Sequence, residues 1–85
     1  MRLMTTQHQA KTVHPLSYYR RWALLSQRDL GARCGITAST IYLIENGRTV
    51  PKLPTMAKIC RALGVQWEDV AEFRATMGAQ GVLPR

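Results

Sequence analysis

The sequence predicts an all-α domain built from five short helices. Apolar residues recur three and four positions apart along most of the chain, which is the period of a helix with one buried face. Glycines follow several of these runs, where a left-handed residue commonly ends a helix, and no segment shows the alternation of a strand. The chain has 85 residues, enough for one domain, and its 46% of hydrophobic residues excludes a disordered basic tail.

We divide the chain into three parts by composition. Residues 1–14 are polar and without a sustained period, which predicts a flexible arm; residues 15–73 form the domain, and residues 74–85 are expected to fray. The start has no apolar segment typical of a signal peptide, and the longest apolar run, residues 22–25, is far short of the roughly 20 residues of a membrane span. We therefore expect a cytoplasmic protein with no membrane contact.

The first helix is predicted to begin at Pro15 and to end at about Leu24. Proline suits the first turn of a helix, because its missing N–H has no partner there in any case. We expect Arg20 and Arg21 to face partly outward. The apolar face consists of Leu16, Tyr19, Ala23 and, less regularly placed, Trp22.

The second helix is predicted to begin after Ser26. Asp29 follows three residues later, so the pair resembles a capping box, in which each side chain accepts a hydrogen bond from the other residue's backbone. The helix should end by Cys34, because Gly35 can take the left-handed conformation that closes a helix.

The third helix follows after a very short turn. Thr37 is its predicted N-cap, Ile41 and Ile44 form its buried face, and it stops at Asn46 and Gly47. Two short helices joined by such a tight turn are typical of the helix-turn-helix arrangement.

Two more helices complete the expected fold. The fourth covers residues 53–63, with Pro54 in its first turn and Gly64 as its stop, and the fifth covers residues 65–73. Trp67, Val70 and Phe73 belong to the fifth helix, where we expect Trp67 and Val70 to seal the core. The apolar stripe of the fourth helix is Leu53, Met56, Ile59, Cys60 and Leu63.

The charge indicates the class of partner. The formal net charge is +7, and ten of the twelve basic residues but only two of the five acidic ones lie within the first 61 positions. Such an excess favours a polyanion, with nucleic acid ahead of a membrane surface.

Several short motifs follow one another along the chain: SQRDL at 26–30, GIT at 35–37, STI at 39–41, IENGR at 44–48, Pro51 and ALGV at 62–65. A small residue, Gly31, lies where the two helices would cross, and a glycine lies in the turn. In order and separation, these features resemble the Cro/repressor-type (XRE-like) helix-turn-helix family of DNA-binding proteins over residues 15–73. The resemblance implies a five-helix lambda-repressor-like fold.

The resemblance also implies roles for individual residues. Gln27 matches the position that contacts a phosphate and braces the recognition helix, and Asn46 and Arg48 match loop residues that grip the DNA backbone. Arg20 and Glu45 match an ion pair between the first and third helices. The third helix, residues 37–46, would enter the major groove with its first turn toward the base edges.

The outward side chains of the third helix depart from the family's usual pattern. Ala38, Ser39, Tyr42 and Leu43 include no bidentate reader of bases, so we expect thymine-methyl contacts, a few hydroxyl hydrogen bonds and DNA shape to give specificity. Tyr42 and Leu43 have the alternatives of packing against the core or of binding protein. The candidate DNA contacts are Gln27, Arg28, Thr37, Ala38, Ser39, Thr40, Tyr42, Leu43, Asn46, Arg48 and Lys52.

The sequence thus predicts a transcriptional regulator without enzymatic activity, a homodimeric repressor of double-stranded, pseudo-palindromic operator DNA. The alternatives are an antitoxin that also binds a partner toxin, and a mobile-element regulator with a protein partner. We expect no cofactor or metal, because His8 and His14 have no partner at ligand spacing, and Cys34 and Cys60 fit small buried hydrophobes. Ligand sensing is not expected, because there is no second domain to hold an effector.

Overall fold

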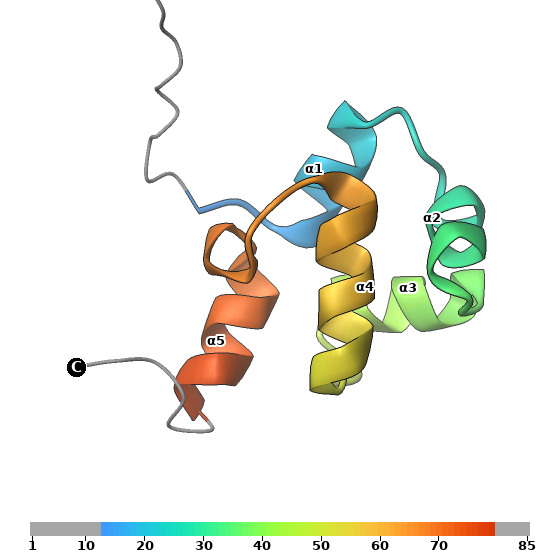
Figure 1. The fold of residues 1–85 in the computed structure, drawn as a ribbon. Helices are drawn as coiled ribbons and strands as arrows, with labels where there is room; N and C mark the ends of the chain where they lie inside the picture. The colour runs from blue at the N-terminus through green and yellow to red at the C-terminus, as the bar shows by residue number, and fades with distance from the viewer. Residues whose placement is uncertain (1–12, 80–85) are drawn as a thin grey trace, which may run out of the picture.

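The computed structural model describes residues 13–79 and contains five α-helices and one 3₁₀ helix in that range. Helix α4 lies between α5 on one side and the α2–α3 pair on the other (Figure 1). The all-α class predicted from the sequence is confirmed. Within residues 13–79, no helix has the length and apolar character needed to cross a bilayer. The elements are α1 (Leu16–Trp22), α2 (Gln27–Cys34), α3 (Ala38–Glu45), α4 (Leu53–Leu63), η2 (Trp67–Asp69) and α5 (Ala71–Ala79).

All five α-helices contribute to one hydrophobic core. Of the inward positions predicted for the third and fourth helices, Ile41, Ile44, Met56 and Ile59 are buried. Cys60 and Leu63 are half-buried, and Leu53 is about half exposed at the start of α4. Met77 of α5 joins the core from the segment predicted to fray. The buried apolar residues are Leu16, Leu30, Cys34, Ile41, Ile44, Met56, Ile59, Val70, Phe73 and Met77.

Helices α2 and α3 begin and end where the sequence predicts. The Ser26 hydroxyl accepts a hydrogen bond from the Asp29 N–H at 2.9 Å, and the Asp29 carboxylate accepts one from the Ser26 N–H at 3.2 Å. Gly35 ends α2 at φ +73°. The Thr37 hydroxyl accepts from the Thr40 N–H at 3.1 Å and so caps α3. These local contacts account for both helix starts.

Helix α1 is shorter than predicted. It ends at Trp22, two residues before the expected stop, and Leu24 takes a left-handed backbone at φ +60°. The predicted outward position of Arg20 is wrong, because that residue is only 8% exposed, whereas Arg21 is exposed as expected. Ala23, predicted on the buried face, is exposed.

The predicted fifth helix is also wrong in its bounds. A 3₁₀ helix is followed by an extended Val70, and α5 then runs to Ala79, well past the expected end. Val70 forms a β-bridge with His14: the His14 N–H donates to the Asp69 carbonyl at 3.0 Å, and the Ala71 N–H donates to the His14 carbonyl at 2.8 Å. This pairing across the chain interrupts the helix and fixes the end of the expected arm.

Candidate nucleic-acid interface

Helices α2 and α3 cross so closely that one position must lack a side chain. A Cβ atom on the buried Gly31 would lie 2.6 Å from the Ile36 carbonyl oxygen and 3.1 Å from the carbonyl carbon of Thr37. Both are backbone atoms of the turn before α3, so they cannot give way as a side chain would. Gly31 therefore sets how near the start of α3 lies to α2.

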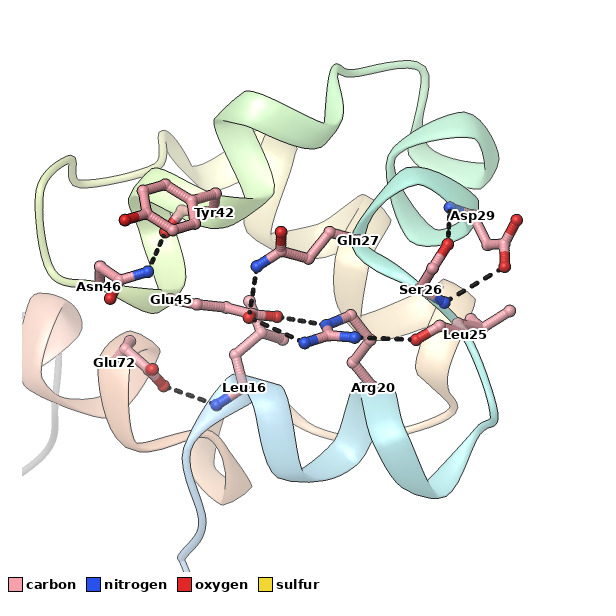
Figure 2. Close-up of polar contacts among 10 residues, drawn as sticks. All are labelled: Leu16, Arg20, Leu25, Ser26, Gln27, Asp29, Tyr42, Glu45, Asn46 and Glu72. Carbon is pink, nitrogen blue, oxygen red and sulfur yellow. Dashed lines mark hydrogen bonds and ion pairs between the residues drawn. The ribbon is translucent and has the colours of Figure 1, made fainter.

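A buried ion pair joins α1 to α3, as the sequence resemblance implies. The Arg20 Nε donates to Glu45 Oε2 at 2.6 Å, and Nη2 donates to Oε1 at 3.1 Å (Figure 2). The third guanidinium nitrogen, Nη1, donates to the Leu25 carbonyl in the loop before α2 at 2.9 Å. The side chains of Arg20 and Glu45 are 10% and 6% exposed, so the charges compensate one another out of water.

Gln27 connects α2 to the same pair. Its Nε2 donates to Glu45 Oε1 at 3.0 Å, so the last residue of α3 is held from both α1 and α2 (Figure 2). Glu45 accepts only, which settles that the amide nitrogen faces it. An amide carries two N–H groups, and this contact uses one of them.

The outward face of α3 is uncharged. Tyr42 is 51% exposed and Leu43 is 38% exposed, so both lie at the surface, and Ser39 is exposed near the N-terminus. Ala38, expected to point outward, is half-buried. The hydroxyls of Thr37 and Thr40 lie 3.0 Å apart, so the capping contact orients both groups at the start of the helix.

Exposed positive and polar side chains precede and follow this helix in the chain. Arg28 is exposed in the first turn of α2, and Arg48 and Lys52 are exposed in the loop between α3 and α4. Asn46 caps the end of α3 by donating from Nδ2 to the Tyr42 carbonyl at 2.8 Å (Figure 2). The outward face of α3 is thus uncharged, and exposed cations lie on the elements before and after it.

The family resemblance implied that Gln27 braces the third helix, but not that Glu45 is its partner, because that hydrogen bond depends on where α2 lies relative to α3. The sequence analysis missed a group of exposed apolar residues at the end of α1. Trp22, predicted on the apolar face of the first helix, is 73% exposed, and Leu24 is 89% exposed. Tyr18 belongs to the same face, and its four-residue spacing from Trp22 was the available signal.

The thiols and the described histidine show no metal-binding arrangement. Within residues 13–79, no three His, Cys, Asp or Glu side chains are placed to hold a metal ion, and His8 lies outside that range. Cys34 is buried and burial raises its pKa; Cys60 is half-buried, and burial together with the nearby carboxylates raises its pKa to about 11. Both side chains are therefore neutral thiols at neutral pH.

Comparison with known proteins assigns the family. A family model described as "Helix-turn-helix domain" matches residues 16–73, which is more than half of the chain. The chain belongs to the helix-turn-helix domain family. Within this helix-turn-helix domain, α2 and α3 are the two helices joined by the tight turn at Gly35.

Three similar proteins carry related names. An uncharacterized HTH-type transcriptional regulator of Methanocaldococcus jannaschii is 40% identical over 55 residues, which cover 65% of this chain and 83% of that protein. One from Bacillus subtilis is 35% identical over 60% of this chain and 62% of its own length. One from Methanothermobacter thermautotrophicus is 41% identical over 54% of this chain and 67% of its own. No solved structure matches the chain.

Proposed function

We propose that this helix-turn-helix protein is a non-enzymatic transcriptional regulator, acting as a repressor, that binds double-stranded DNA with α3 in the major groove. The observation that carries the proposal is the exposed, uncharged face of α3 flanked by Arg28, Arg48 and Lys52. A helix fits the major groove, and cations with helix N-termini beside it hold phosphates. Gln27, held against Glu45, uses its second N–H for a phosphate.

The charged residues supply affinity in this proposal, and α3 supplies discrimination. Ser39 and the Thr37–Thr40 pair offer hydroxyls, while Ala38 and Leu43 offer apolar contacts to thymine methyl groups. Tyr42 contacts the sugar–phosphate backbone at the edge of the groove. Specificity then depends on methyl contacts and on DNA shape more than on paired hydrogen bonds.

Selection from random duplexes, followed by thymine-to-uracil replacement, tests the readout. We expect one preferred site, and we expect the loss of its thymine methyl groups to weaken binding about tenfold, a loss of about 1.4 kcal/mol. In a Leu43→Ala variant the same replacement should have a smaller effect. Unchanged affinity for the uracil duplex would show that methyl contacts do not provide the specificity.

Salt dependence tests the phosphate contacts. If about six phosphates are neutralised, the logarithm of affinity falls with the logarithm of salt concentration at a slope near −5. Arg48→Gln should make the slope shallower by about 1, whereas Arg21→Gln, an equal charge change on the opposite side of α1 from the buried Leu16, should leave it unchanged. A nearly flat dependence would contradict DNA binding through this surface.

We further propose that two copies bind a pseudo-palindromic operator with half-sites about 34 Å apart. Exposed apolar side chains of α1 and its following loop, namely Tyr18, Trp22 and Leu24, support a contact between copies. His14 stacks on Tyr18 with ring centroids 3.7 Å apart, which stiffens this surface. Sedimentation of a Trp22→Ala, Leu24→Ser variant should show a shift toward monomer, and an unchanged dimer would exclude this surface.

A further inference from the structure

Two hollows lie on α4, and none of the proposed DNA contacts lines either of them. The larger, of about 600 Å³, lies between α4 and the segment that includes η2 and α5. Leu53, Ala57 and Cys60 line it from α4, and Trp67 and Met77 line it from the other side. This volume and mostly apolar lining match those of small-molecule sites in proteins.

The α4 wall of this hollow is one continuous face. Its residues recur at intervals of three and four from Leu53 to Gly64, the spacing of positions on a single side of a helix. The eight-residue step from Leu53 to Arg61 spans about 12 Å at the helical rise of about 1.5 Å per residue. With bonds of about 1.5 Å, an extended chain of roughly ten carbon atoms has this length.

The second hollow is cationic and shares a residue with the first. It has a volume of about 420 Å³ and is lined by Arg33 of α2 and by Lys58, Arg61 and Ala62 of α4. Arg61 lines both hollows, so a ligand in the apolar one can place a charged end among three cations. No acidic residue lines the cationic hollow.

The acidic residues of η2 make the charge around the two hollows uneven. Burial and the nearby Asp69 and Glu68 carboxylates raise the pKa of the Cys60 thiol, so the negative charge of η2 extends to the groove between η2 and α4. An anionic group is therefore repelled from the η2 side and attracted to the α2 side. Because Cys60 stays a neutral thiol, it serves as an apolar wall.

We propose that the two hollows form one binding site for a small amphipathic anion with an apolar chain of roughly ten carbons. The chain lies along α4 against Trp67, and a carboxylate or phosphate lies between Arg33, Lys58 and Arg61. This site is independent of the proposed DNA binding, since none of the predicted DNA contacts lines either hollow. The proposed ligand site lies within the single helical domain, so this proposal differs from the expectation that ligand binding would need a second domain.

Binding of defined probes tests the proposal. The chain has two tryptophans, so Trp22→Phe leaves Trp67 as the only tryptophan reporter in the groove. Decanoate and decyl phosphate, kept below their micellar concentrations, should give saturable changes in its fluorescence, and their relative affinities distinguish a carboxylate from a phosphate ligand. Decanol, which lacks the charge, and acetate, which lacks the chain, should each bind at least about tenfold more weakly.

Three variants in that background locate the site. Arg61→Gln should weaken decanoate binding about tenfold, whereas Arg21→Gln, an equal charge change outside both hollows, should leave it unchanged. Ala57→Phe places a large side chain in the groove from an exposed position and should abolish the fluorescence change. Far-UV circular dichroism confirms that each variant is folded.

Several results would overturn the proposal. These are the absence of saturable binding by either anion, equal binding of decanol, or equal weakening by the Arg21→Gln control. A fourth is a change in the oligomeric state of the ligand-free protein on Ala57→Phe in sedimentation, which would make the groove a contact between copies. None of these results depends on DNA, so this site and the proposed function can fail separately.

Discussion

Helix α1 is attached to the rest of the fold on two sides, and the two attachments differ in chemistry. Toward α3 the attachment is a buried ion pair, Arg20 with Glu45, supported by Gln27 and by the Leu25 carbonyl. All of these partners lie within 25 positions of one another in the chain. Here two full charges are removed from water and depend on each other.

Toward η2 and α5 the attachment is made of separate single hydrogen bonds. The Tyr19 hydroxyl donates to the Asp69 carbonyl at 2.7 Å. The Leu16 N–H donates to Glu72 Oε1 at 2.8 Å (Figure 2). These contacts join residues 50 and 56 positions apart. Burial and the Asp69 charge raise the pKa of Tyr19, so the hydroxyl remains a donor through neutral pH.

This difference predicts how single substitutions weaken each of the two attachments of α1. Removing one member of a buried ion pair leaves an uncompensated charge, which costs far more than the pair contributes. Removing one of several independent hydrogen bonds costs about one bond's worth. The α3 side should therefore be sensitive to single substitutions, and the α5 side should weaken in small steps.

Arg20→Met should produce the largest loss. It leaves the Glu45 carboxylate buried with Gln27 as its remaining side-chain partner, and we expect the free energy of unfolding to fall by about 3–5 kcal/mol. Urea unfolding followed by circular dichroism measures this change. Arg21→Met removes the same charge from an exposed neighbour and should change stability by less than about 0.5 kcal/mol. Equal losses in the two variants would show that burial of the pair is unimportant.

Gly31→Ala should cause the second-largest loss of stability. The new Cβ would lie 2.6 Å from the Ile36 carbonyl oxygen, so α2 and α3 must separate, at a cost of about 1–3 kcal/mol typical of overpacking. The matched control is Ala32→Ser at the exposed neighbouring position, which should be nearly neutral. Unfolding curves that coincide for the two variants would mean that the crossing tolerates a side chain.

The same contrast explains what the sequence could predict of the fold. The starts of α2 and α3 depend on side-chain caps such as Ser26 with Asp29, and α2 and α4 end at glycines such as Gly64, so a local pattern suffices. The region around Val70 could not be predicted in this way. Its extended backbone is stabilised by His14, more than fifty positions earlier, and local helical period alone suggests a continuous helix.

The features of the candidate site also differ in whether a local sequence pattern predicts them. Exposure of Ser39, Tyr42 and Leu43 follows from the phase set by Ile41 and Ile44, which made it predictable. The family resemblance implied that Gln27 braces the third helix. Its partner, Glu45, is known only from the three-dimensional arrangement. The two hollows beside α4 could not be predicted, because they depend on how α5 and α2 pack against it.

Glu72→Ala should lower the free energy of unfolding by less than Arg20→Met or Gly31→Ala does. Pro15 precedes α1 and has no side chain that can cap it, so the Glu72 carboxylate supplies the acceptor for the first N–H. Losing a helix cap costs about 1 kcal/mol. Glu68→Ala, which removes an exposed carboxylate from the same segment, serves as the control in thermal or urea unfolding. A loss above that of Arg20→Met would reverse the proposed order of the two attachments.

Asp29→Asn should have the smallest effect, visible mainly in its dependence on pH. The backbone and hydroxyl hydrogen bonds of Ser26 hold the pKa of Asp29 below its ordinary value of 3.8. Because the folded-state pKa is the lower one, the carboxylate stabilises the fold above the unfolded pKa, and this contribution is lost as pH falls through the folded pKa.

The stability difference between the wild type and Asp29→Asn should therefore be constant near neutral pH and should shrink below about pH 4. Urea unfolding at a series of pH values measures it. Asp29 is fully exposed, so salt should reduce the charge-dependent part of the difference, whereas the loss from Arg20→Met should persist in salt because that pair is buried. A difference that grows on acidification would require a folded-state pKa above that of the unfolded chain, opposite to the effect of the capping hydrogen bonds.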